Sequence, residues 1–324
     1  MKKFPEMTLS IILVLIGFVL LIKGADWMVN GSTLLAKKHR IPDLAIGLTI
    51  VAFGTSAPEL VVNIVASFEN HSDIVLGNII GSNIFNLFAI LGIVGLIFPI
   101  TVQSSTVWKE IPISLVAAIV FLLLGNGYLV YNDVGLSRMD GLVFLFLFLG
   151  FLFYIYKQMK SDPVITEEKI IDTPNSKIWI FIIAGLIGLV IGGKLIVDNA
   201  VSIASSLGVS EKIIGLTIIA AGTSLPELMT SVVAALKKNS DIAIGNIIGS
   251  NIFNIFLILG VSSLVRPIAY STVFNFDLYL LIGGTLFLFL AMFIGKKKKL
   301  DRWEAALLLI TFIGYTTYLV SKEI

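Results

Sequence analysis

The sequence predicts an all-α polytopic membrane protein whose ten transmembrane helices form two inverted five-helix repeats. The first observation is composition: 57% of the 324 residues are hydrophobic, 14% are charged, and the mean hydropathy is +0.99, far above that of a soluble domain. The second is that the apolar runs are continuous, whereas the strands of a membrane barrel alternate apolar and polar residues. The third is an internal repeat, which determines how the helices are grouped.

Ten apolar runs account for most of the chain. Each has about 20 residues, enough to cross about 30 Å of hydrocarbon as a helix. The first run follows two lysines, as in a signal peptide, but its length and the lack of a small-residue cleavage motif favour a first span. We expect spans centred near residues 18, 55, 85, 117, 148, 190, 223, 253, 284 and 312.

The basic residues indicate how the spans are oriented. If the N-terminus is outside, the inner connections contain fifteen Lys and Arg residues and the outer connections contain six. Inner loops of membrane proteins are enriched in Lys and Arg. We therefore expect a multi-pass protein of the cell membrane with both termini outside.

A repeat covers the polar centre of each half. Residues 47–100 align without a gap on residues 215–268, at a constant offset of 168, and 33 of 54 positions are identical. The decapeptide GNIIGSNIFN occurs in both copies. We divide the chain into a first repeat with spans 1–5 (residues 1–156), an inner linker loop (157–177) and a second repeat with spans 6–10 (178–324).

An odd number of spans in each half gives the second copy the opposite orientation in the membrane. Inverted repeats of this kind are typical of secondary transporters, in which the substrate site lies at the repeat interface near the midplane of the bilayer. The sequence therefore predicts a transport site made by both halves.

Polar residues fall at helical spacing in each repeat. Thr55 and Glu59 share one face of their span, as Thr223 and Glu227 do in the second copy. The next span of each repeat carries a polar stripe with the spacing i, i+4, i+8: Asn78, Ser82 and Asn86 in the first copy, and Asn246, Ser250 and Asn254 in the second. For Asn78 and Asn246, ligation and helix–helix contact both remain open.

Each glutamate directly follows a proline. Pro58 and Pro226 lack a backbone N–H, and in a continuous helix each would clash with the carbonyl four residues earlier. A continuous helix would therefore cost about 3 kcal/mol, so we expect each span to break at its proline. The break frees main-chain carbonyls at residues 52–55 and 220–223. Unwound backbone at this depth is tolerated where it is buried in protein or lines a cavity. At the next span, we expect Asp73 and Asp241 to be the N-caps.

The residue types indicate a cation site. An ionisable residue at the centre of a membrane helix costs roughly 2.5 to 3.5 kcal/mol, so a merely structural buried pair of glutamates is a poor explanation. Carboxylates, hydroxyls, amides and carbonyls supply only oxygen ligands, which favour Ca²⁺ or Na⁺ over zinc, copper or iron. The chain has no cysteine, and no histidine cluster or nucleophile–base pair occurs in the spans. We therefore expect no enzymatic activity and no cofactor.

The doubled motifs resemble a known family. GTSAPEL at 54–60 and GTSLPEL at 222–228, each followed by GNIIGSNIFN, are similar to the two α-repeats of the calcium/cation antiporter superfamily, particularly its prokaryotic sodium/calcium exchangers. The resemblance implies exchange of several Na⁺, usually three, for one Ca²⁺ by alternating access, with spans 1 and 6 sliding across the rest. It also implies these ligands: Glu59 and Glu227 at the centre, carbonyl oxygens of Thr55 and Thr223 for Ca²⁺, and Ser56, Ser224, Ser82, Ser250, Asn86, Asn254 and the carbonyls of Ala52 and Ala220 around them.

One position departs from part of the family. Several relatives, including the potassium-dependent exchangers, have aspartate where this chain has Asn254. The resemblance then implies a site of formal charge −2 and no K⁺ requirement. Proton-coupled calcium exchangers usually have a GNxxE pattern in place of GTSxPE, which favours Na⁺ as the counter-ion.

Two alternatives remain open. An antiporter of the same architecture could use H⁺, or could carry another divalent cation. A cation channel could also use carboxylates, although a pore usually forms around an axis along the membrane normal, which inverted repeats do not provide. The expected partners are Ca²⁺, Na⁺ and the lipid bilayer, with no nucleic acid, and we expect the monomer to be functional.

Overall fold

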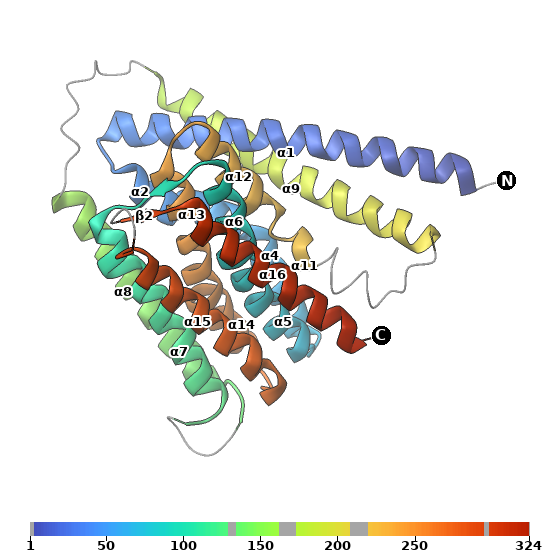
Figure 1. Ribbon diagram of the computed structural model, residues 1–324, viewed down its shortest axis with the longest axis vertical. Coiled ribbons are helices and arrows are strands. Elements are labelled where there is room, and N and C mark those ends of the chain that lie inside the picture. The colour runs from blue at the N-terminus through green and yellow to red at the C-terminus, as the bar shows by residue number, and fades with distance from the viewer. Residues whose placement is uncertain (1–2, 129–133, 162–172, 208–219, 295–297, 324) are drawn as a thin grey trace.

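The computed structural model describes residues 3–128, 134–161, 173–207, 220–294 and 298–323, and almost all of them are helical (Figure 1). The elements of the first half are α1 (Lys3–His39), α2 (Asp43–Ile46), the π-helix η1 (Gly47–Val51), α3 (Ala52–Thr55), α4 (Ala57–Phe68), α5 (Ser72–Ile84), the π-helix η2 (Phe85–Ile90), α6 (Leu91–Ile97), β1 (Ile100–Thr101), the π-helix η3 (Thr106–Glu110), α7 (Ile111–Gly125) and α8 (Arg138–Ser161). The elements of the second half are α9 (Asn175–Ser206), α11 (Ala220–Gly222), α12 (Leu225–Leu236), α13 (Ser240–Ile252), the π-helix η5 (Phe253–Leu259), α14 (Gly260–Val265), the 3₁₀-helix η6 (Thr272–Phe274), α15 (Asn275–Ala291), β2 (Lys299–Leu300) and α16 (Arg302–Glu323).

Nine of the predicted spans lie in the described residues. Eight helices are long and apolar enough to cross a membrane, and the segment Asp43–Phe68 forms a ninth that is bent by 48°. The predicted seventh span, near residue 223, is represented here by α11 and α12, and residues 208–219 before them lie outside the described part of the chain. The seventh span, and with it the total of ten, therefore stays a prediction.

Two spans form the core of the molecule. In the most apolar part of Ser240–Val265, 94% of the residues are buried, and in that of Ser72–Ile97, 78%. The peripheral spans bury far less, 22% for α1 and 17% for α16. These two central spans carry the duplicated GNIIGSNIFN motif, so the repeat marks the part of the chain with the most protein around it.

Glycines bring the second core span against the bent segment. A Cβ on Gly245 would lie 3.0 Å from the Cα of Gly47, and a Cβ on Gly249 would lie 2.8 Å from the Cβ of Ala52. Small residues at such contacts let helix backbones approach closely. This packing places α13 directly beside the helix break that precedes Glu59.

A second glycine contact joins α1 to α9. The two long helices run side by side and antiparallel across one end of the bundle (Figure 1). A Cβ on Gly24 would lie 2.8 Å from the carbonyl oxygen of Gly185, and one on Gly17 would lie 2.9 Å from that of Gly192. Because backbone meets backbone at several turns, α1 and α9 form a close pair.

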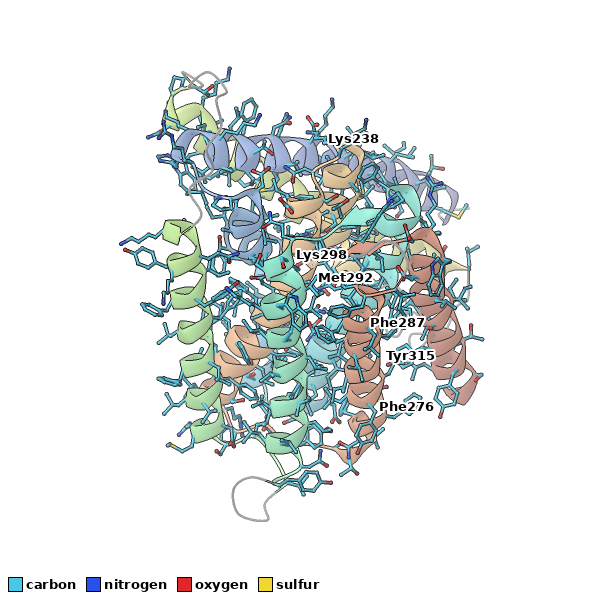
Figure 2. The ribbon with its side chains drawn as sticks, turned by 60° about the vertical axis from the view of Figure 1, so that its left-hand side comes forward. Lys238, Phe276, Phe287, Met292, Lys298 and Tyr315 are labelled. Carbon is cyan, nitrogen blue, oxygen red and sulfur yellow. The ribbon has the colours of Figure 1, made fainter. Side chains whose placement is uncertain are left out.

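The two ends of the bundle have different connections. At one end, β1 pairs antiparallel with β2, Ile100 opposite Leu300, and Gln103 donates a 2.6 Å hydrogen bond to Asp241. We call this end the sheet side. At the other end, Leu136 pairs with Ile268 in a single antiparallel bridge. Lys238 and Lys298 lie toward the sheet side, and Phe276 lies toward the opposite side (Figure 2).

The predicted N-caps are corrected by the structure. The helices α5 and α13 begin at Ser72 and Ser240, so Asp73 and Asp241 lie in the first turn and not at the cap. At α13 the cap is Asn239, whose side chain accepts a 3.0 Å hydrogen bond from the N–H of Ile242. The serine before each aspartate is already helical, so each cap lies two residues before the predicted aspartate.

Candidate cation site

The predicted breaks occur in both repeats. The helix α3 ends at Thr55, Ser56 has φ −83° and ψ 7°, and α4 then begins with Pro58 in its first turn. In the second copy Ser224 has φ −91° and ψ 9°, and α12 begins directly after it. The first turn of a helix has no intrahelical partner for its N–H groups, so proline is tolerated there. Each proline thus starts a new half-helix and places the next residue, a glutamate, at the break.

The two glutamates are held by serines of the opposite repeat. Ser56 Oγ donates a 2.9 Å hydrogen bond to Glu227 Oε1, and Ser224 Oγ donates a 3.1 Å hydrogen bond to Glu59 Oε1. Glu59 and Glu227 are each only 1% exposed. The reciprocal bonds bring both breaks and both carboxylates to one buried place.

Threonines and asparagines make a second set of links between the repeats. Thr55 Oγ1 donates to Asn246 Oδ1 at 3.0 Å, and Thr223 Oγ1 donates to Asn78 Oδ1 at 3.4 Å. The side-chain amide of Asn246 also donates to the Glu227 carbonyl at 3.2 Å and to Ser231 Oγ at 2.9 Å. Asn246 therefore joins a threonine of one repeat to the backbone of the other, which supports the helix-contact role.

Several predicted ligand atoms have no partner in the protein. Among the described residues, six buried oxygens of the predicted set make no hydrogen bond: Glu59 Oε2, Glu227 Oε2, Ser82 Oγ, Ser250 Oγ, Asn86 Oδ1 and Asn254 Oδ1. A buried polar atom without a partner costs about 1 to 3 kcal/mol, and a charged one costs more. The six atoms form three pairs of repeat-equivalent oxygens, and one pair comes from carboxylates; oxygens of these types are the ligands that hard cations prefer.

The main-chain carbonyls are only partly free. The carbonyl oxygen of Ala52 accepts the N–H of Ser56 at 3.0 Å, and the Thr55 hydroxyl lies 3.3 Å from the same oxygen, so a ligand would compete for its second lone pair. The hydroxyl of Thr55 lies 3.1 Å from the Val51 carbonyl, so back-bonding competes with its contact to Asn246. The backbone of Ala220 lies in α11, and no described contact assigns its carbonyl a role.

The polar stripes continue into π-helices. The α-helical turn of α5 ends at Ile84, and Asn86 lies in η2; in the second copy Asn254 lies in η5. A π-helical turn inside a membrane helix changes the direction of the side chains that follow, and such turns are frequent at functional sites. The i, i+4, i+8 spacing assumes an unbroken α-helix, so it carries no signal for this change of helix type.

Two asparagines of the site were missed by the sequence reasoning. Asn86 Nδ2 donates to Asn251 Oδ1 at 3.2 Å, and Asn254 Nδ2 donates to Asn83 Oδ1 at 3.4 Å. Asn83 and Asn251 are buried and equivalent in the repeat. In both asparagines the amide nitrogen is thus engaged while the oxygen has no partner among the described residues. The available signal was the second residue of the duplicated SNIFN segment, a polar residue that lies outside the i, i+4, i+8 stripe.

A groove lies beside the two helix breaks. Its volume is about 430 Å³, and it is lined by Pro58, Thr223 and Pro226 at the breaks and by Lys194 and Asp198 of α9. The groove lies between α9 and the half-helices that carry the glutamates. One side of the groove is therefore formed by α9, whose glycines pack closely against α1.

Comparison with known proteins gives a consistent result over the whole chain. Residues 9–157 and 177–321 match a family described as sodium/calcium exchanger protein. A protein of Alkalimonas amylolytica named as an antiporter, CaxA, is 40% identical over 98% of this chain and 100% of its own length. The sodium/calcium exchanger MaX1 of Methanosarcina acetivorans is 31% identical over 96% of this chain and 99% of its own.

A solved structure has the same fold. The sodium-calcium exchanger NCX_Mj superposes with a TM-score of 0.83 and 34% sequence identity, covering 96% of this chain and 99% of that chain. At this identity and coverage, the similarity extends from the peripheral helices to the duplicated core.

Proposed function

The chain belongs to the sodium/calcium exchanger family, and on that premise we propose that it is a secondary active transporter exchanging Na⁺ for Ca²⁺ across the membrane by alternating access. It is a multi-span cation exchanger and not an enzyme, with ions as its substrates. The observation that carries the proposal is the set of six buried, unpaired oxygens, two from the glutamates at the helix breaks and four from the serines and asparagines of the core spans.

The proposed site uses both repeats equally. Glu59 Oε2 and Glu227 Oε2 supply two negative charges, which balance one Ca²⁺, while Ser82, Ser250, Asn86 and Asn254 supply neutral oxygens. Ser56 and Ser224 hold the other carboxylate oxygens at 2.9 and 3.1 Å. Thr55 and Thr223, with Ala52 and Ala220, complete the proposed ligands through carbonyl oxygens. Replacing Ca²⁺ by Na⁺ spreads the positive charge over several ions without moving the carboxylates.

Alternating access is supported by the packing of α1 and α9. Their closest contacts are glycine contacts with each other, and the groove beside them reaches Thr223 and Pro226 at the site. We propose that this pair slides across the two inverted repeats (residues 1–156 and 178–324, joined by the linker 157–177), closing the groove and opening the sheet side. The monomer contains the complete proposed site, so we propose that it is the functional unit.

The proposed exchange is independent of K⁺. Asn254 is neutral where potassium-dependent relatives have aspartate, and its amide is engaged by Asn83 at 3.4 Å. A site of charge −2 is neutral with one Ca²⁺ and has no further carboxylate to balance a co-transported K⁺.

The deciding experiment is ⁴⁵Ca²⁺ uptake into proteoliposomes that contain the purified chain. An outward Na⁺ gradient should drive uptake, an imposed pH gradient without Na⁺ should not, and omission of K⁺ should leave the rate unchanged. Uptake that follows the pH gradient and ignores Na⁺ would establish the H⁺-coupled alternative. Currents far above the turnover of a carrier would indicate a channel.

A further inference from the structure

Two grooves lie between corresponding helix pairs of the two halves. The first, of about 550 Å³, lies between α7 and α8, and the second, of about 410 Å³, lies between α15 and α16. Phe256 of η5 contributes to the lining of the first groove, and Phe88 of η2 contributes to that of the second. These phenylalanines are 168 residues apart and are equivalent in the repeat, so the grooves are a matched pair.

The first groove is apolar and open to the surroundings of the bundle. Val116 on one wall is 49% exposed and Phe146 on the other is 76% exposed. A Cβ on Gly150 would meet no described heavy atom within 4 Å. The groove is hollow there because the residue has no side chain. In a membrane, exposed apolar walls of this kind face acyl chains.

One described residue distinguishes the grooves. Lys109 lines the first groove at its sheet-side end, whereas no charged residue lines the second. The Lys109 Nζ lies 5.2 Å from the centroid of the Tyr154 ring, and the Tyr154 hydroxyl donates a hydrogen bond to the buried carboxylate of Glu110. Among the described residues, no carboxylate forms an ion pair with Lys109. The ammonium group therefore lies above the aromatic ring, and because Lys109 is exposed, its ammonium is accessible to an anion.

We propose that the groove between α7 and α8 binds an anionic phospholipid of the sheet-side leaflet, with an acyl chain between the helices and the phosphate at Lys109. From Lys109 of η3 to Val116 of α7, the helix rises about 10 Å at about 1.5 Å per residue. One leaflet contributes about 15 Å of the hydrocarbon core. The groove thus spans most of one leaflet, starting at the depth where a phosphate meets the headgroup region. The second groove accepts an acyl chain without preference for its headgroup.

The lipid would lie behind a segment that carries a candidate ligand. Phe256 is two residues after Asn254, and both belong to η5. Filling the groove supports the π-helical backbone from its lipid-facing side. This binding does not depend on which ions the protein exchanges.

The test measures lipid binding to the full chain by native mass spectrometry. Purified protein is titrated with phosphatidylglycerol or phosphatidylcholine, and the preference for the anionic lipid is the ratio of the two affinities. Lys109→Gln should lower this preference about fivefold, the contribution of one lysine near an anionic headgroup. Gly150→Leu should remove the preferred lipid altogether, because the added side chain fills the groove.

Matched controls separate this groove from general surface charge. Gly283→Leu fills the second groove, where a Cβ also meets no described atom within 4 Å, and should leave the preference intact. Lys160→Gln removes a lysine of α8 that lies over Tyr156 and does not line the groove. The proposal is overturned if Lys109→Gln and Gly150→Leu keep the full preference, or if Lys160→Gln lowers it as much as Lys109→Gln does.

Discussion

Glu59 and Glu227 each give one carboxylate oxygen to a serine of the other repeat and keep the second oxygen unpaired. This division fixes the orientation of each carboxylate without neutralising it. The serine bond holds the side chain in one rotamer, so the free oxygen of each carboxylate has a defined direction. A cation entering the site then meets groups that are already positioned, which reduces the entropy lost on binding.

Replacing one carboxylate should abolish exchange. Glu227→Gln keeps the size of the side chain and can still accept the Ser56 hydrogen bond, but it removes half of the charge that balances Ca²⁺. Loss of one partner of a buried charge pair costs about 3 to 5 kcal/mol, so Ca²⁺ flux should fall more than about 100-fold. The measurement is ⁴⁵Ca²⁺ flux together with the thermal unfolding profile.

The matched control is Glu110→Gln. Glu110 is also a fully buried glutamate, but it accepts a hydrogen bond from Tyr154, away from the two helix breaks. This variant should retain Na⁺-driven flux. If Glu227→Gln transports normally, or if both variants lose flux equally, the assignment of the site is wrong.

Adding a third carboxylate should strengthen Ca²⁺ binding. Asn254→Asp changes the proposed site from charge −2 to −3, and the affinity of oxygen sites for Ca²⁺ rises with the number of charged ligands. We expect the KM for Ca²⁺ to fall roughly tenfold, with slower turnover because release becomes harder. Asn70→Asp, on the exposed turn before α5, adds the same charge outside the site and should change neither constant. An unchanged KM in Asn254→Asp would place Asn254 outside the site.

At the scale of the elements, the half-helices and π-helical turns decide where the ligands lie. The bend of 48° at Ser56 allows α3 and α4 to present a carbonyl end and a glutamate to the same cavity. The glycines of α13 allow the backbone of η1 and α3 to approach it closely. The bend depends on a proline, which has no N–H group, and the close approach depends on glycines, which have no side chain.

Removing the second proline should weaken Ca²⁺ binding without weakening the fold. Pro226→Ala restores an N–H and removes the clash with the Gly222 carbonyl, so the helix can continue through the break. We expect the KM for Ca²⁺ to rise several-fold while the unfolding temperature stays the same or increases. The control is Pro112→Ala, a proline in the first turn of α7 at some distance from the breaks, whose loss should leave the KM unchanged. An unchanged KM in Pro226→Ala would show that the proline does not shape the site.

The contact between α1 and α9 should tolerate no added side chain. In Gly185→Ala the new Cβ would lie 2.6 Å from the Met28 backbone nitrogen and 2.8 Å from the Gly24 carbonyl oxygen. Overpacking of this kind costs about 1 to 3 kcal/mol and should lower the unfolding temperature. Gly314→Ala on α16, where a Cβ meets no described atom within 4 Å, should be neutral. Equal stability of the two variants would contradict the close pairing.

At the scale of the whole molecule, equivalent turns of the two repeats lie on opposite sides of the bundle. Glu69 follows α4 on the side opposite the sheet, and its equivalent in the repeat, Lys237, follows α12 on the sheet side. Lys237 forms a 2.6 Å ion pair with Asp26 of α1, whereas Glu69 lies 3.7 Å from His71. The turn after α12 thus carries two lysines, Lys237 and Lys238, and the equivalent turn after α4 carries none, which agrees with the predicted orientation in which the sheet side faces inward.

The natural absence of cysteine allows a direct test of this topology. In intact cells, a membrane-impermeant maleimide should label Glu69→Cys, because the side with fewer basic residues is expected to face outward. It should not label Lys237→Cys until the membrane is permeabilised. Labelling of both variants in intact cells would contradict the inverted arrangement, and the reverse pattern would contradict the predicted orientation.

The sequence by itself determined the class of protein, the positions of nine described spans, the two helix breaks and the residues around them. Composition, apolar run length and proline chemistry are local properties, and the duplicated motif shows which residues act together. The resemblance drawn from GTSAPEL and GTSLPEL is confirmed by the match to the sodium/calcium exchanger family.

Only the tertiary structure decided how these residues meet. The cross-repeat bonds of Ser56 and Ser224, the roles of Asn83 and Asn251, and the π-helical turns at Asn86 and Asn254 involve partners about 165 to 171 positions away or a local change of helix type. Hydrophobic periodicity contains no information about such partners, because it reports which face is apolar and not what that face contacts. The prediction of the helix caps was wrong for the same reason, because the position of the first helical turn also depends on contacts with neighbouring segments. At the cap of α13, the side-chain amide of Asn239 donates a 2.8 Å hydrogen bond to Asp43.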